Sequence, residues 1–109
     1  MASNNFVFTE EAEIDINQTI YYIVNELGDK SAAKKLCDKL FDVIQRICEF
    51  PYSSESAENK FIKNKNVRRA LVDNYLLFYL YDEDKRLVVL LRFIYGKRSI
   101  TELIKEISF

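Results

Sequence analysis

The chain has 109 residues, about half of them apolar, and a formal net charge of −1. This length suits one domain with a single core, and no apolar run approaches the ~20 residues that cross a bilayer. The start contains no basic segment followed by an apolar stretch, which argues against a secretory signal or transit peptide and favours a cytoplasmic location.

The absence of histidine removes the commonest general acid and base, so any catalysis must use tyrosine, lysine, arginine or carboxylates. With only two cysteines, a zinc site is not expected. Both Cys37 and Cys48 are expected to pack in the core as small apolar groups. The sequence therefore predicts a protein without metal or cofactor.

Charge is distributed unevenly along the chain. Residues 1–59 carry 5 basic and 11 acidic groups, whereas residues 60–98 carry 10 basic and 4 acidic groups. A polarised small domain suggests a basic functional face for nucleic acid or for an acidic protein partner.

The N-terminal residues predict a short edge strand followed by a helix. Phe6–Phe8 is the strand, and Thr9 can cap a helix whose first turn is acidic. Apolar residues then recur at helical spacing from Ile16 to Leu27, and Gly28 ends this helix.

A second helix begins at Asp29 or Ser31. Its apolar stripe runs from Ala33 to Cys48, and Pro51 stops it. The short connection between two such helices predicts an antiparallel hairpin. Four apolar residues lie off the two stripes and are expected to face the sheet or a partner: Tyr21, Tyr22, Phe41 and Val43.

Residues 52–65 are polar and lack periodicity, so they predict a loop with at most a turn near Phe61 and Ile62. The period then changes to two, and tight turns at Asp73–Asn74 and Asp82–Lys85 separate three strands: Val67–Val72, Tyr75–Tyr81 and Leu87–Tyr95. The three successive carboxylates from Asp82 to Asp84 are interpreted as a solvated turn rather than a metal site.

The last strand is almost continuously apolar, which is typical of a central strand with both faces covered. The helix hairpin would cover one face. A short C-terminal helix can cover the other with three apolar residues, Leu103, Ile104 and Ile107.

Ser99 and Glu102 form a capping box that would begin this C-terminal helix. Gly96, Lys97 and Arg98 lie just before it, where a helix N-terminus and two cations favour a phosphate or a carboxylate. The alternative is that Gly96 supplies a positive φ and that the two cations are only solvated.

Five basic residues are the candidate target-binding or anion-binding set: Arg68, Arg69, Arg92, Lys97 and Arg98. Because neighbours in a strand alternate between faces, Arg68 and Arg69 cannot point the same way. We expect one of them to join Arg92 or the turn cations in an anion-binding patch.

Three motifs give this chain a recognisable pattern: Val67-Arg68-Arg69, Asn74-Tyr75 followed by Phe78-Tyr79, and Leu91-Arg92 leading to Tyr95-Gly96-Lys97-Arg98. With the helix hairpin before them, they resemble the RelE/ParE superfamily of bacterial toxin-antitoxin toxins over nearly the whole chain. The resemblance implies one α+β domain over residues 1–109. In it, an antiparallel helix hairpin packs on a small, mainly antiparallel sheet that is followed by a short C-terminal helix.

The superfamily divides by target. Toxins of the RelE branch cut messenger RNA on the ribosome and place an arginine just after the residue that matches Tyr75, and a tyrosine near the C-terminus. This sequence has Leu76 and Ile104 at these positions, so only Arg69 and Arg98 remain as counterparts of the catalytic cations, with Tyr95 as a substitute proton donor. General acid-base help is worth ~10²- to 10⁴-fold in rate.

These departures favour the ParE branch, whose members poison DNA gyrase by protein contact and are neutralised by a cognate antitoxin. The resemblance therefore implies a growth inhibitor that acts by binding, without cofactor. Two alternatives stay open: a RelE-like, metal-independent endoribonuclease that acts with ribosome and mRNA, and an inactive relative that only binds its antitoxin.

Overall fold

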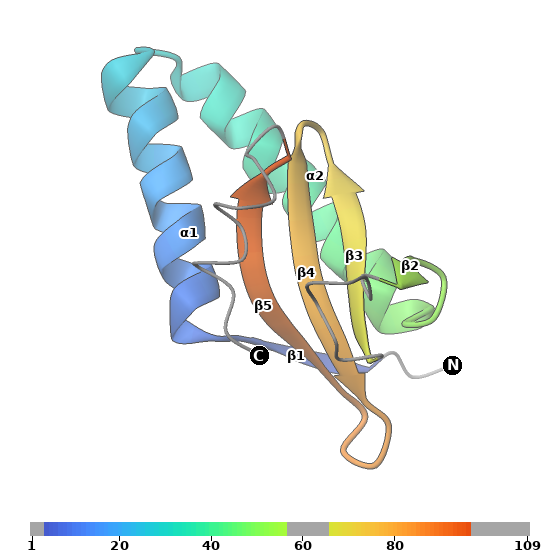
Figure 1. Cartoon of the computed structure of the whole chain (residues 1–109). Helices are drawn as coiled ribbons and strands as arrows, with labels where there is room; N and C mark the ends of the chain where they lie inside the picture. Colours follow the sequence, from blue (N-terminus) through green and yellow to red (C-terminus); the bar gives the residue numbers. More distant parts are fainter. Residues whose placement is uncertain (1–3, 57–65, 97–109) are drawn as a thin grey trace.

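A single sheet with two helices on one of its faces makes up the computed structural model, which describes residues 4–56 and 66–96 (Figure 1). In this part of the chain the sheet has five strands in the following order: β1 (Asn5–Phe8), β5 (Leu87–Tyr95), β4 (Tyr75–Asp82), β3 (Val67–Val72) and β2 (Glu55–Ser56). β1 runs parallel to β5, and the other neighbours are antiparallel. The predicted α+β class, the edge strand and the central position of β5 are confirmed.

The first helix begins and ends as its local sequence predicts, apart from a widened last turn. Thr9 Oγ1 accepts the Ala12 N–H at 3.1 Å at the start of α1 (Glu10–Tyr21). A π-helical turn, η1 (Tyr22–Glu26), replaces the predicted continuation of the α-helix to Leu27. Gly28 then adopts φ +64°, as expected for the residue after a helix C-terminus.

The second helix, α2 (Lys30–Glu49), is capped by Asp29, whose Oδ1 accepts the Ala32 N–H at 2.9 Å. Its apolar stripe forms the centre of the core together with the near faces of β3, β4 and β5, and Ile44 is completely buried. Tyr79 of β4 is equally buried, and its hydroxyl donates to the Pro51 carbonyl oxygen at 3.1 Å.

The outlying apolar residues divide into two groups. Val43 faces the sheet and is buried in the core, which confirms one of the two predicted environments, whereas Tyr21, Tyr22 and Phe41 are exposed. The face of α2 that meets the sheet is therefore wider than the stripe suggests. Of the two cysteines, Cys48 is buried and Cys37 is half-buried.

The opposite face of the sheet carries a second apolar cluster, which we call the outer face. Val67, Phe78 and Ile94 are its buried members, and Leu76 and Leu91 pack against them. Each of β3, β4 and β5 thus contributes to both faces.

The prediction of an unstructured loop after Pro51 is wrong at one place, because Glu55 and Ser56 form β2 and pair with Arg69 and Arg68. A strand of two residues is too short to show a periodic pattern in the sequence, and it forms here because its backbone pairs with β3. The turns at Asp73–Asn74 and after Asp82 are confirmed, and Asp73 has φ +52°.

Several predicted features lie outside the described residues. These are the turn near Phe61 and Ile62, the capping box of Ser99 and Glu102, the C-terminal helix and the cations Lys97 and Arg98. Among the described helices, none is long and apolar enough to span a membrane.

Candidate functional site

Two of the candidate cations are neighbours on β3 and lie on opposite faces of the sheet, as predicted. Arg69 pairs with Phe78 and therefore shares the outer face, whereas Arg68 pairs with Tyr79 on the face that carries the helices. The Arg68 guanidinium donates to the carbonyl oxygens of Tyr52 and Ser54 and lies 5.1 Å from the centre of the Tyr52 ring. Arg68 thus holds the segment that follows α2 against the sheet.

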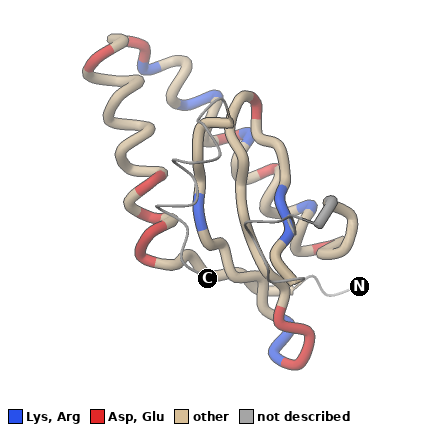
Figure 2. The backbone as a smooth tube through the Cα atoms, in the orientation of Figure 1, with Lys and Arg blue, Asp and Glu red and all other residues tan. Residues whose placement is uncertain are grey.

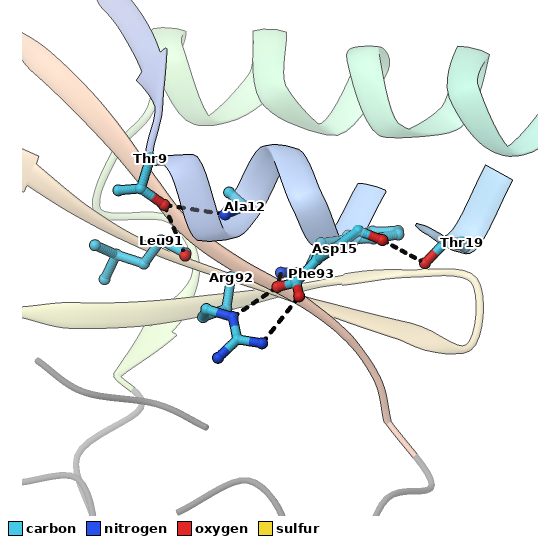
Figure 3. Close-up of polar contacts among 7 residues, drawn as sticks. All are labelled: Thr9, Ala12, Asp15, Thr19, Leu91, Arg92 and Phe93. Carbon is cyan, nitrogen blue, oxygen red and sulfur yellow. Dashed lines mark hydrogen bonds and ion pairs between the residues drawn. The ribbon is translucent and has the colours of Figure 1, made fainter. Parts of the chain in front are cut away.

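Arg92 of β5 forms a bidentate ion pair with Asp15 of α1 (Figure 3). Its Nε and Nη2 donate to the two carboxylate oxygens at 2.6 and 2.9 Å, and the Phe93 N–H donates to the same carboxylate at 3.0 Å. Both charged side chains are only 11% exposed. A bidentate pair in this setting fixes direction as well as distance between helix and strand.

Thr9, the N-cap residue of α1, extends this polar junction toward the start of the helix. Its N–H donates to the Leu90 carbonyl oxygen at 3.0 Å, and its hydroxyl donates to that of Leu91 at 2.9 Å while accepting the Ala12 N–H. β1 pairs with β5 only as far as Leu90. Beyond that point, the Thr9 hydroxyl and the Asp15 carboxylate are the hydrogen-bond partners of backbone groups on this edge of β5. We call this set of contacts the α1–β5 clasp.

A cleft of about 580 Å³ opens between the C-terminal half of the first helix and the end of β5. We call it the tyrosine cleft, after three of its lining residues, Tyr22, Tyr75 and Tyr95. The Tyr75 ring stacks on Phe93 at 4.9 Å and meets the Tyr95 ring edge-on at 5.5 Å. Burial, and then the neighbouring Tyr95 and Tyr22, raise the pKa of Tyr75, so its hydroxyl stays a neutral donor at physiological pH.

A second cleft, of about 570 Å³, follows the edge of β3 that β2 leaves unpaired in the described part of the chain. Arg46 of α2 and Arg69 stand among its lining residues, and apolar side chains such as Ile47 and Leu71 form much of its surface. Leu71 is 68% exposed, the highest value among the large apolar residues of the described chain.

Figure 2 shows where the charged residues lie along the described fold. Acidic residues mark the first turns of α1, the turn between β4 and β5 carries acidic and basic residues together, and the arginines of β3 and β5 lie along the sheet. In the acidic turn the Asp82 carboxylate accepts the Lys85 N–H at 3.2 Å, which agrees with the interpretation as a turn.

The structure divides the candidate cations that it describes between the two faces of the sheet. Arg68 faces the helices, whereas Arg69 and Arg92 both pair with Phe78 and so share the other face, with β4 between them. The residue that the sequence analysis missed is Asp15. One signal could have indicated it: this carboxylate sits between two isoleucines in a helix that carries no basic residue to pair with it.

Comparison with known proteins identifies a matching family. The family model for the ParE toxin of the type II toxin-antitoxin system parDE matches residues 6–100. Curated protein sequences give no match.

Two solved structures share the fold. A chain of the toxin-antitoxin complex RelBE2 from Mycobacterium tuberculosis has a TM-score of 0.59 at 17% identity, over 86% of this chain and 99% of that chain. A chain of the chromosomal ParDE toxin-antitoxin system from P. aeruginosa has a TM-score of 0.68 at 11% identity, over 87% of this chain and 98% of that chain.

Proposed function

Because this chain belongs to the ParE toxin family of type II toxin-antitoxin systems, we propose that it inhibits growth by binding DNA gyrase and that a cognate antitoxin neutralises it. The observation that carries the choice of target is the outer face of the sheet. Leu76, at the position where RelE-like nucleases place an arginine, packs there against the apolar cluster of Val67, Phe78 and Ile94. An apolar surface favours protein contact over stabilisation of a phosphate transition state.

The contacts of the arginines support the same choice. Arg92 is held by Asp15 in the α1–β5 clasp, and Arg68 is held by backbone carbonyls after α2. A cation that positions structural elements is poorly placed to move onto a target. We propose that the target contact lies at the basic turn, Lys97 and Arg98, together with Arg69, which lies on the outer face beside the apolar cluster.

An antitoxin partner is supported by two similar solved structures, one a toxin-antitoxin complex and the other from a toxin-antitoxin system. The chain also leaves large apolar side chains exposed on its helices, among them Tyr21 and Phe41. A partner segment that becomes ordered over such surface would bury it, which is the usual way in which a disordered chain binds a folded one. A gyrase target also implies action in the cytoplasm.

The proposal is tested by titrating the purified protein into a gyrase supercoiling and cleavage assay. We expect inhibition by the native chain, and at least a tenfold loss of potency in Lys97→Glu with Arg98→Glu, because the double change reverses the charge of the proposed contact. Circular dichroism and binding of the antitoxin should be unchanged. The matched control is Lys34→Glu with Lys35→Glu, which makes the same charge change on the exposed side of α2.

Full potency of the folded Lys97→Glu, Arg98→Glu variant would refute the proposed contact. A native chain that leaves gyrase untouched would refute the proposed target. In cells without antitoxin, labelled thymidine incorporation should fall before amino-acid incorporation.

The exposed Tyr95 hydroxyl at the end of β5 favours a second candidate, a RelE-like endoribonuclease that needs no metal. Tyr95 pairs with Tyr75 on the face that carries the helices, whereas Arg69 lies on the outer face. If this candidate is right, amino-acid incorporation falls first, and Arg69→Ala and Tyr95→Phe each reduce cleavage of ribosome-bound message. If neither synthesis falls, the chain is an antitoxin-binding relative without toxic activity.

A further inference from the structure

β1 forms one edge of the sheet (Figure 1). The N–H groups of Asn5 and Thr9 donate to backbone carbonyl oxygens in β5 and just before it, at 3.2 and 3.0 Å. Because successive residues of a strand direct their N–H and C=O groups to alternate sides, those of Phe6 and Phe8 point away from β5. β1 thus presents backbone donors and acceptors along an edge that no other described strand covers.

Edge strands of soluble proteins usually carry a feature that discourages pairing with another chain, such as a charged side chain or a proline. The opposite edge of this sheet has such protection, since β2 covers part of β3, and Arg46 and Arg69 line the cleft beside the rest. β1 lacks it, because the six residues from Asn4 to Thr9 include no charged residue and no proline. Phe6 and Val7 are nevertheless 38% and 44% exposed. An edge of this kind is a template for a further strand.

A second copy of β1 fits this edge in one register. If the two strands run antiparallel with Phe6 of each opposite Phe8 of the other, all the outward N–H and C=O groups of both residues are paired. A shift of two residues one way would place Phe8 opposite Asn4, whose N–H already donates to the Cys48 carbonyl oxygen at 3.0 Å. The same shift the other way would place Phe6 opposite Glu10, which belongs to α1.

The side chains suit the same register. The rings of Phe6 and Phe8 already meet edge-on within one chain, with their centres 5.6 Å apart. Pairing with a second copy brings four such rings together on one face of the joined strands, and aromatic pairs across strands are favourable.

The charges at the two ends of β1 are complementary. The acidic first turn of α1 follows the end of β1, while Lys85 and Arg86 lead into β5 beside the start of β1. The acidic residues of that turn, Asp82 to Asp84, come before them, at the end of β4, which lies one strand further from β1. Antiparallel pairing brings the end of each β1 beside the start of the other, so each acidic helix start approaches the basic residues of the other copy.

We propose that two copies of this chain associate through their β1 strands, in antiparallel register with Val7 at the two-fold axis, and so join their sheets into one. Each strand contributes only four residues, and small interfaces are weak, so the dimer forms in a concentration-dependent manner. Paired residues of two strands lie on the same face of a sheet, so the dimer presents two outer faces side by side. This proposal does not rest on the identity of the toxin's target.

The proposal is tested by analytical ultracentrifugation of the full chain over a wide range of protein concentration. We expect a monomer–dimer equilibrium, and at least tenfold weaker association of Val7→Lys and of Val7→Glu, because each change places two like charges opposite one another at the axis. An equimolar mixture of these two variants should dimerise again, which also shows that both are folded. The matched control is Leu71→Lys at the opposite edge, a 68% exposed site, which should associate like the native chain.

A native chain that stays monomeric at every concentration would overturn the proposal. So would a dimer that Val7→Lys leaves intact, or a mixture of the two Val7 variants that stays monomeric, because the contact would then not have Val7 at its axis. Loss of association in Leu71→Lys alone would place the contact at the β3 edge instead.

A disulfide at the axis tests the register directly. Residues that lie opposite one another between two hydrogen-bonded pairs have Cα atoms about 4.5 Å apart, within the range that a disulfide spans. Val7→Cys should therefore give a disulfide-linked dimer on mild oxidation, in a chain that carries Cys37→Ala to remove the half-buried native thiol. Leu71→Cys in the same background is the control and should link at least tenfold more slowly, as measured by intact mass without reductant. Equal rates would mean random collision and would overturn the register.

Discussion

The two helices reach the same sheet by different means. α1 packs Ile16 and Ile20 against the core and also meets β5 through the α1–β5 clasp, in which hydrogen bonds and one ion pair join atoms far apart in the sequence. α2 meets the sheet through an apolar stripe in which Leu40, Ile44 and Ile47 are almost fully buried. Buried apolar side chains stabilise the fold but allow a helix to pack on the sheet in several nearby positions, whereas a bidentate ion pair allows only one relative orientation. The difference teaches that directional polar contacts fix the position of α1, beside the tyrosine cleft, whereas buried apolar surface fixes the position of α2.

The largest effect is expected from breaking the clasp. Asp15→Ala should lower the free energy of unfolding by about 3–5 kcal/mol, because it leaves the largely buried Arg92 guanidinium without its carboxylate. Urea denaturation at neutral pH measures the loss. The control is Glu13→Ala on the exposed side of the same helix, where the loss should stay below about 1 kcal/mol.

A double-mutant cycle sharpens this test. When Arg92→Met is added to Asp15→Ala, part of the lost stability should return, since the buried charge is then removed together with its partner. If Asp15→Ala costs no more than Glu13→Ala, the clasp does not position α1, and the contrast between the helices fails.

The apolar region should respond to a change of volume. Ile44→Ala is expected to cost about 2–5 kcal/mol, because the side chain is completely buried and its removal leaves a cavity under α2. Phe41→Ala, on the same helix but 53% exposed, should cost less than about 1 kcal/mol despite the larger deletion. Equal losses for the two variants, measured by urea denaturation, would mean that α2 is not held by its stripe.

The parts of the fold that were predictable are those whose signals are local. The caps at Thr9 and Asp29 and the turn at Asp73–Asn74 follow from residues within four positions of one another, and all three are confirmed. The apolar stripes predicted the hairpin and most of the core for the same reason.

The parts that were missed depend on distant residues. Asp15 and Arg92 are 77 residues apart, so no spacing in the sequence joins them. β2 was missed because Glu55 and Ser56 are extended only through their pairing with β3, which lies further along the chain. The tyrosine cleft draws its residues from α1, η1, β4 and β5, and it exists only once those elements have packed. Of the candidate site, the structure describes Arg68, Arg69, Arg92 and Tyr95, and the roles of Lys97 and Arg98 stay predictions.

Tyr79 is the polar exception in the apolar region, and its hydroxyl gives the smallest expected effect. Tyr79→Phe removes the hydrogen bond to Pro51 and should cost about 0.5–1.5 kcal/mol at pH 7. Burial raises the pKa of Tyr79 above its usual value of about 10, against weaker opposing contributions from hydrogen bonding with Ser54 and from Arg68. The folded state thus favours the neutral phenol. This stabilisation is complete below about pH 10 and is lost as the pH rises through the raised pKa of Tyr79 in the folded state.

Urea denaturation between pH 7 and pH 11 should therefore show a steeper alkaline loss of stability in the native chain than in Tyr79→Phe, so that the cost of the substitution shrinks and then reverses. Other groups that titrate in this range are present in both proteins, and their contribution cancels in the difference. Tyr21→Phe, at a site that is 64% exposed, serves as the control and should follow the native profile. Parallel profiles for the native chain and Tyr79→Phe would mean that the phenol ionises as easily in the folded state as in the unfolded one. The polar contact at the end of α2 would then be dispensable, and α2 would be held by apolar area alone.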